Sequence, residues 1–157
     1  MRKTNGRQAG FTIIEVMLVT MIVGVLAALV LPSIRANTVR VKMSEALFAF
    51  GTCRAAVTEI YLAGGESPGP GNWGCEIARD ASVYVDSVTT EEGGNIKVSL
   101  RGFKDLRIDF HDLTLMPLDG TGTPMDGAGG IVRRWRCGAA ADGTNVPPQY
   151  LPGTCRG

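Results

Sequence analysis

An apolar segment extends from Phe11 to Leu31, and Glu15 is the one ionisable residue within it. At about 1.5 Å of helical rise per residue, these 21 residues would span roughly 31 Å, the hydrocarbon thickness of a bilayer. A carboxylate inside such a segment costs about 3 kcal/mol on insertion-based scales, which makes Glu15 a candidate functional residue. The simpler alternative is an acidic residue close to the headgroups, because Glu15 lies one turn into the segment.

Beyond the apolar segment, hydrophobic residues recur with helical spacing. They are separated by 4, 3, 4, 3, 4 and 3 positions and comprise Val39, Met43, Ala46, Phe50, Cys53, Val57 and Ile60. This spacing places one apolar stripe along a helix. The pattern therefore predicts a single long helix from about Phe11 to Ala63, apolar all round over residues 11–32 and amphipathic over residues 33–63.

Two helix-breaking residues lie within this predicted helix. Gly24 lowers helix stability by about 1 kcal/mol, and Pro32 cannot donate a backbone hydrogen bond to residue 28. We therefore expect a bend or a melted stretch between them. Gly24 is equally compatible with close packing between membrane helices.

Residues 64–157 predict a strand-rich domain. Glycine and proline between Gly64 and Asn72 end the helix, and β-branched or alternating residues predict strands at Ser82–Thr90 and Ile96–Leu100. A last strand is expected at Ile131–Cys137. The expected fold class is α+β, with the long N-terminal helix packed against a four-stranded antiparallel sheet and a C-terminal disulfide-bounded loop.

The middle of this domain carries a change of parity. Leu106, Ile108 and Phe110 alternate as in a strand, whereas Leu113 and Leu115 continue with the opposite parity. Because a one-residue shift moves side chains to the other face of a sheet, a bulge or a break is needed near residues 111–112. The glycine-rich segment from residue 119 to residue 130 is expected to be a mobile loop.

Charge gives little indication of nucleic-acid binding by the chain as a whole. The formal net charge is +1, and without Arg2, Lys3 and Arg7 it becomes −2, with 13 basic against 15 acidic residues. These three basic residues precede the apolar segment, so the positive-inside tendency would keep them in the cytoplasm. A secretory signal peptide is the rival interpretation, but its hydrophobic region is only about 7–15 residues long.

The chain contains four cysteines, Cys53, Cys75, Cys137 and Cys155. An even number outside the membrane favours disulfides over metal binding or catalysis. Four cysteines allow three pairings, and the sequence does not choose among them, although proximity favours Cys53–Cys75 and Cys137–Cys155. The second pair would close a 19-residue segment and stabilise it by roughly 3 kcal/mol.

Candidate enzymatic and metal sites are few. His111 is the only histidine, and no nucleophile motif accompanies it. Asp119 and Asp126 flank the glycine-rich segment without the dense oxygen ligands of calcium loops. We therefore expect no enzyme activity, no cofactor and no bound metal.

Arg133, Arg134 and Arg136 surround Trp135 and form the one local basic cluster. Such a cluster suits contacts to DNA phosphates, with the aromatic ring stacking on a base. A solvated strand face is the simpler interpretation, because three charges supply little phosphate affinity at physiological salt.

The segment Gly10-Phe11-Thr12-Ile13-Ile14-Glu15, preceded by a short basic leader, resembles the processing site of type IV prepilins. The resemblance implies that residues 1–10 are a leader, which a prepilin peptidase removes by cutting between Gly10 and Phe11. It implies N-methylation of the new amino terminus at Phe11. It further implies that Glu15 supports this methylation and pairs with the N-terminal amine of a neighbouring subunit. In assembled pili of this family, the helix is often unwound between a glycine and a proline placed like Gly24 and Pro32.

A second resemblance lies at the C-terminus. Trp135-Arg136-Cys137-Gly138 and Tyr150-Leu151-Pro152-Gly153-Thr154-Cys155 are similar to the entry and exit of the disulfide-bounded C-terminal loop of type IVa pilins. The additional cysteines, Cys53 and Cys75, are not universal in that family. The middle of the chain, about residues 64–130, matches the family only in architecture.

Together the two resemblances imply a major type IV pilin. Such a subunit polymerises from the bacterial inner membrane into an extracellular filament used for adhesion and twitching motility, with DNA uptake as a further role. The implied partners are other copies of the chain, the prepilin peptidase, the inner membrane, the assembly platform and its ATPases, and a host surface or DNA. The alternatives are a minor pilin, a type II secretion pseudopilin, or a membrane-anchored module that binds DNA or another ligand.

Overall fold

A computed structural model describes residues 10–64, 66–127 and 129–157, without the side chains of residues 30–36. The chain divides into two compact units, Met1–Arg35 and Ala36–Gly157. The leader expected at residues 1–10 lies outside the described residues, apart from Gly10. The second unit, here called the head, contains all four strands.

The first element is the helix α1, Ile13–Leu62. Thr12 caps it, because its hydroxyl accepts a hydrogen bond from the backbone N–H of Glu15 at 3.3 Å. α1 is a single element through Gly24 and Pro32, so the melted stretch predicted between them does not occur in the described helix. A glycine and a missing proline N–H weaken only local turns, and the hydrogen bonds of the flanking turns keep the rest of the helix intact.

The first half of α1 carries apolar side chains that the single chain leaves uncovered. Every described side chain from Phe11 to Leu29 is exposed. Within the described ranges, no helix has both the length and the hydropathy needed to cross a membrane.

The second half of α1 supplies one side of the core of the head. The predicted stripe is confirmed at its centre, where Met43, Ala46, Phe50, Cys53 and Val57 are buried. The same stripe ends in half-buried residues at both extremes, and Tyr61 extends the buried face by one further turn. The sequence period thus identified the face of α1 that packs against the sheet.

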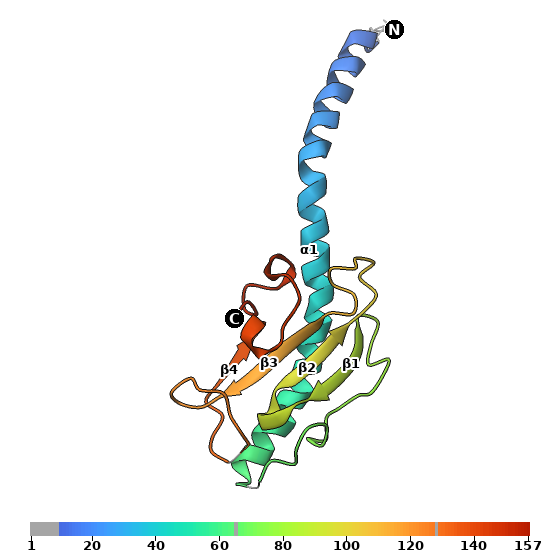
Figure 1. Cartoon of the computed structure of the whole chain (residues 1–157). Coiled ribbons are helices and arrows are strands. Elements are labelled where there is room, and N and C mark those ends of the chain that lie inside the picture. Colours follow the sequence, from blue (N-terminus) through green and yellow to red (C-terminus); the bar gives the residue numbers. More distant parts are fainter. Residues whose placement is uncertain (1–9, 65, 128) are drawn as a thin grey trace, which may run out of the picture. The chain divides into compact units, whose positions relative to one another are not determined.

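The sheet provides the other side of this core and has the predicted α+β architecture. Its strands are β1 (Val85–Thr90), β2 (Ile96–Leu100), β3 (Asp112–Leu118) and β4 (Arg134–Cys137). They lie in the order β1-β2-β3-β4, and each neighbouring pair is antiparallel. Figure 1 shows these strands lying across the second half of α1, with the C-terminal loop in red beside β4.

The predicted alternation in the middle of the head needs a correction. Leu106, Ile108 and Phe110 are not in a strand, and β3 begins only at Asp112, after the predicted break. Ile108 is fully buried, whereas Leu106 and Phe110 are 82% and 83% exposed. Lys104 and Phe110 have positive φ angles of 59° and 65°, which interrupt extended backbone.

Candidate functional site

The N-terminal site is built on the first turn of α1. Phe11, Ile13 and Ile14 are 77%, 81% and 78% exposed, and the exposed Glu15 follows directly. The capped helix N-terminus fixes the position of Glu15 relative to Phe11. A carboxylate among apolar side chains attracts a cationic partner strongly once both are removed from water.

Two disulfides close the head. Cys53 of α1 is bonded to Cys75, with 5.0 Å between their Cα atoms, and Cys137 of β4 is bonded to Cys155, with 4.5 Å. Both pairs that sequence proximity favours are therefore present. The first bond ties the loop after α1 to the helix, and the second returns the C-terminal loop to the end of β4.

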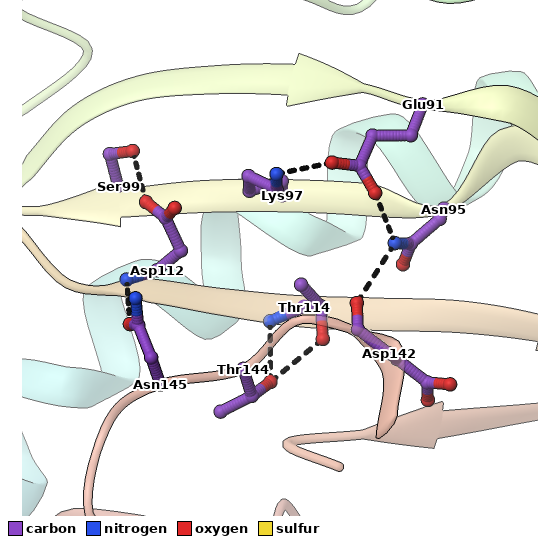
Figure 2. Close-up of polar contacts among 9 residues, drawn as sticks. All are labelled: Glu91, Asn95, Lys97, Ser99, Asp112, Thr114, Asp142, Thr144 and Asn145. Carbon is purple, nitrogen blue, oxygen red and sulfur yellow. Dashed lines mark hydrogen bonds and ion pairs between the residues drawn. The ribbon is translucent and has the colours of Figure 1, made fainter. Parts of the chain in front are cut away.

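Polar contacts hold the C-terminal loop on the sheet between the two ends of its disulfide (Figure 2). The Thr114 backbone N–H donates to the Thr144 hydroxyl at 3.1 Å, and the two hydroxyls lie 2.7 Å apart. The Asp112 backbone N–H donates to the Asn145 side chain at 2.6 Å. Because Thr114 is fully buried, these contacts give the loop one fixed register on β3.

Asn95 connects this loop to the β1–β2 turn. Its side-chain amide donates to the carboxylate of Glu91 at 2.8 Å and to the carbonyl of Asp142 at 3.2 Å, and Asn95 is 2% exposed. Glu91 also forms an ion pair with Lys97 (Figure 2). The predicted strands at Ser82–Thr90 and Ile96–Leu100 leave room for this turn, but the sequence does not indicate the buried amide.

The basic cluster is smaller in the structure than in the sequence. Arg136 forms an ion pair with Asp142, whose side chain is 4% exposed, and this carboxylate raises the pKa of Arg136. The guanidinium of Arg54 lies 5.7 Å from the centre of the Trp135 ring and covers one of its faces. Arg133 and Arg134 remain exposed, so two of the three arginines present a basic surface.

A carboxylate that the sequence analysis missed organises the loop after α1. Glu76 accepts hydrogen bonds from the backbone N–H groups of Trp73 at 2.8 Å and Cys75 at 2.9 Å, and from the hydroxyl of Thr90. Burial raises its pKa, but these hydrogen bonds outweigh burial and hold the pKa below its usual value. The signal available in the sequence was the acidic residue directly after Cys75.

The remaining candidates have structural roles. Asp119 accepts hydrogen bonds from the backbone N–H groups of Thr121, Gly122 and Thr123 and so forms a turn. His111 Nδ1 lies 3.1 Å from the carbonyl oxygen of Asp109. In the part of the chain that the structure describes, no three potential ligands form a metal-binding group.

Comparisons with known proteins agree with this arrangement. Residues 39–156 match the family described as "Pilin (bacterial filament)", and residues 5–31 match the "Prokaryotic N-terminal methylation motif". The chain is 34% identical to a fimbrial protein of Neisseria meningitidis serogroup B over 97% of this chain and 96% of that protein. It is also 34% identical to the type IV major pilin protein PilE1 of Neisseria gonorrhoeae, covering 97% and 89%, and 33% identical to the fimbrial protein EcpC of Eikenella corrodens, covering 95% and 91%.

An exposed apolar helix joined to a disulfide-closed head is typical of structural proteins that assemble with copies of themselves. The chain belongs to the type IV pilins, the family of bacterial filament subunits. It is accordingly a structural subunit of an extracellular pilus, and its main partner is a second copy of itself rather than a substrate.

Proposed function

We propose that this chain is a major pilin, made as a precursor in the inner membrane and polymerised into a filament for adhesion and twitching motility. Residues 1–10 are the leader, residues 11–32 lie in the membrane and later in the filament core, residues 33–63 are the amphipathic half of the helix, and residues 64–157 are the strand-rich domain. Cytoplasmic ATPases drive assembly through a membrane platform.

The observation that carries this proposal is the uncovered apolar half of α1. Phe11, Ile13, Ile14 and Leu29 are each more than 70% exposed in the single chain. At about 25 cal/mol per Å², this surface strongly favours burial in lipid or among copies of itself. The methylation-motif match over residues 5–31 supports processing between Gly10 and Phe11, followed by methylation of Phe11 by the prepilin peptidase.

Glu15 has the central role in assembly. It is exposed one turn from Phe11, among side chains that become buried when filaments form. A free carboxylate there would be costly in a low-dielectric core, and the N-terminal amine of a neighbouring subunit neutralises it. Subunits therefore enter the filament in one axial register.

The proposal is tested by the intact mass and N-terminal fragmentation of protein from sheared filaments, measured with and without reductant. We expect an abundant chain that begins at N-methyl-Phe11 and is four hydrogens lighter before reduction. An uncut chain would contradict processing, and processed protein that never enters filaments would indicate a minor pilin or a pseudopilin.

A matched pair of substitutions tests Glu15 itself. Glu15→Gln should abolish filaments while the protein remains in the membrane, because the neutral amide cannot neutralise the amine. Glu59→Gln changes an exposed carboxylate elsewhere on α1 and should leave filaments at wild-type amount. Normal filaments with Glu15→Gln would instead favour a membrane-anchored binding module.

DNA uptake is a second role, favoured by the exposure of Arg133 and Arg134. Replacing both with glutamine should lower DNA binding by sheared filaments and weaken its salt dependence without changing pilus amount. Arg136 is not included in this test because its ion pair with Asp142 supports the fold.

A further inference from the structure

The connection between β2 and β3 displays two large apolar side chains to solvent. Leu106 and Phe110 are 82% and 83% exposed, the highest values among the large hydrophobic residues of the head. Both belong to the same short connection, which ends where β3 begins at Asp112. Scattered exposed apolar residues are ordinary, but two at this exposure in one connection suggest a contact surface.

The connection is held in one conformation by its own contacts. Asp109 accepts hydrogen bonds from the backbone N–H groups of Phe103 at 2.8 Å and Lys104 at 2.9 Å, and Ile108 between the two exposed residues is fully buried. Phe110 has a φ of 65°, a left-handed conformation that is unfavourable for an aromatic residue. The apolar side chains are therefore presented by an ordered and locally strained backbone.

This surface lies at the end of the head where α1 enters. Arg40, near the start of the head, donates to the carbonyl of Gln149 at 3.3 Å, and the adjacent Tyr150 ring lies 5.4 Å from the guanidinium of Arg107. Figure 1 shows the β2–β3 connection and the C-terminal loop flanking α1 at this end. The head begins at Ala36, one turn of α1 before Arg40.

Basic side chains accompany the two apolar ones. Lys104 is exposed on the same connection, and Arg40 is exposed near the start of the head. Lys42 lies 4.9 Å from the centre of the Tyr84 ring, which is tilted by 53° against the Phe103 ring. Three acidic residues near this surface are engaged within the head.

Each of these three residues has a partner in the head. Asp105 pairs with Arg107, Asp109 accepts the two backbone hydrogen bonds described above, and Glu45 accepts one from the Tyr84 backbone N–H. Apolar side chains beside exposed lysine and arginine are the chemistry of proteins that rest on an anionic lipid surface.

We propose that, before assembly, Leu106 and Phe110 insert into the interface of an anionic phospholipid bilayer, with Lys104 and Arg40 contacting headgroup phosphates. This inference rests on the membrane-embedded stage of the proposed function. The head would then be held against the bilayer by its own surface as well as by the helix, which restricts its orientation before a subunit is extracted into the filament.

The test uses the full chain in vesicles of phosphatidylethanolamine and phosphatidylglycerol with brominated acyl chains, which quench nearby tryptophan. Phe110→Trp and Leu106→Trp add a reporter on the proposed surface. Phe48→Trp adds one at an equally accessible position on α1, where Phe48 is 77% exposed. Trp73 and Trp135 give the same background in every variant.

We expect the added fluorescence of Phe110→Trp and Leu106→Trp to be quenched at least twofold more than that of Phe48→Trp, and less when phosphatidylcholine replaces phosphatidylglycerol. Equal quenching at all three positions would overturn the proposal, as would a Phe110→Trp signal that responds only to protein density, which would indicate a second copy. Flotation of the wild-type chain with vesicles distinguishes a failure of the membrane stage from a failure of this inference. A chain that fails to float with vesicles overturns the membrane stage itself, whereas a chain that floats without selective quenching overturns only this inference.

Discussion

Arg136 and Asp142 are joined by two parallel contacts, from Nε to Oδ2 at 2.8 Å and from Nη2 to Oδ1 at 2.6 Å. The carboxylate is almost fully buried, and the carbonyl of the same aspartate accepts from Asn95. The pair therefore links β4, the C-terminal loop and the β1–β2 turn. Arg136 is a structural residue at the start of the disulfide loop.

Arg136→Ala should lower the free energy of unfolding by about 2 kcal/mol, because it leaves a buried carboxylate without its charged partner. Urea unfolding of the detergent-solubilised chain measures this change. Arg133→Ala, at an exposed position nearby, should change stability by less than about 0.5 kcal/mol. Equal effects of the two substitutions would show that the ion pair contributes nothing specific.

The lowered pKa of Glu76 predicts how the free energy of unfolding depends on pH. Its pKa is lowered in the folded chain, so its stabilising contribution is complete above its unfolded pKa of 4.5 and is lost as the pH falls through the folded value. Glu76→Gln should lower the free energy of unfolding by about 1–2 kcal/mol at pH 7. The difference from wild type should shrink below pH 4.5. Glu66→Gln, at an exposed site, should change the free energy of unfolding by less than about 0.5 kcal/mol at pH 7.

Gly138, the glycine that follows Cys137 in the C-terminal motif, is required by its backbone conformation and its close contacts. Its φ is 78°, and a Cβ at this position would overlap the carbonyl of Cys155. Gly138→Ala should therefore destabilise the head by about 2 kcal/mol. Gly153→Ala is the control, since a Cβ there meets nothing within 4 Å. Similar melting temperatures for the two variants would contradict the steric argument.

The backbone strain at Phe110 can be measured by comparing an alanine with a glycine substitution at this position. Phe110→Ala keeps a Cβ at a φ of 65°, whereas Phe110→Gly removes it. The glycine variant should exceed the alanine variant in free energy of unfolding by about 1 kcal/mol, because left-handed backbone disfavours a Cβ. Identical unfolding curves would indicate that the connection relaxes without the aromatic ring.

The parts of the fold that the sequence predicted correctly rest on long periodic patterns. Helical spacing held from Met43 to Val57, and each of those stripe positions is buried. β2 likewise buries Ile96, Val98 and Leu100, as strict alternation predicts. Over several repeats, only one face of an element is consistent with such a pattern.

The prediction failed where the pattern was short. Leu106, Ile108 and Phe110 give only three alternating positions. So short a pattern does not distinguish a strand from a turn. The positive φ angles of Lys104 and Phe110 decide the conformation. Neither residue is a glycine, so the sequence does not indicate left-handed backbone at these two positions. The expected strand was therefore a connection with one buried and two exposed side chains.

The candidate site was predicted only in part, for a different reason. The motif around Phe11 and Glu15 is contiguous in sequence, so it is visible without a structure. The roles of Arg136 and Asn95 depend on Asp142, which the fold brings to both of them. A basic cluster in sequence does not reveal which of its charges is already neutralised.

The order of the strands in the sheet has a consequence for biogenesis. Each strand pairs with the one made immediately before it, from β1 to β4. A head that folds as it is synthesised can add strands one by one, with no strand waiting for a partner still to be synthesised. Cys53 and Cys75 both precede β1, whereas Cys155 follows β4, so oxidation can begin at one disulfide and finish at the other in the order of translation.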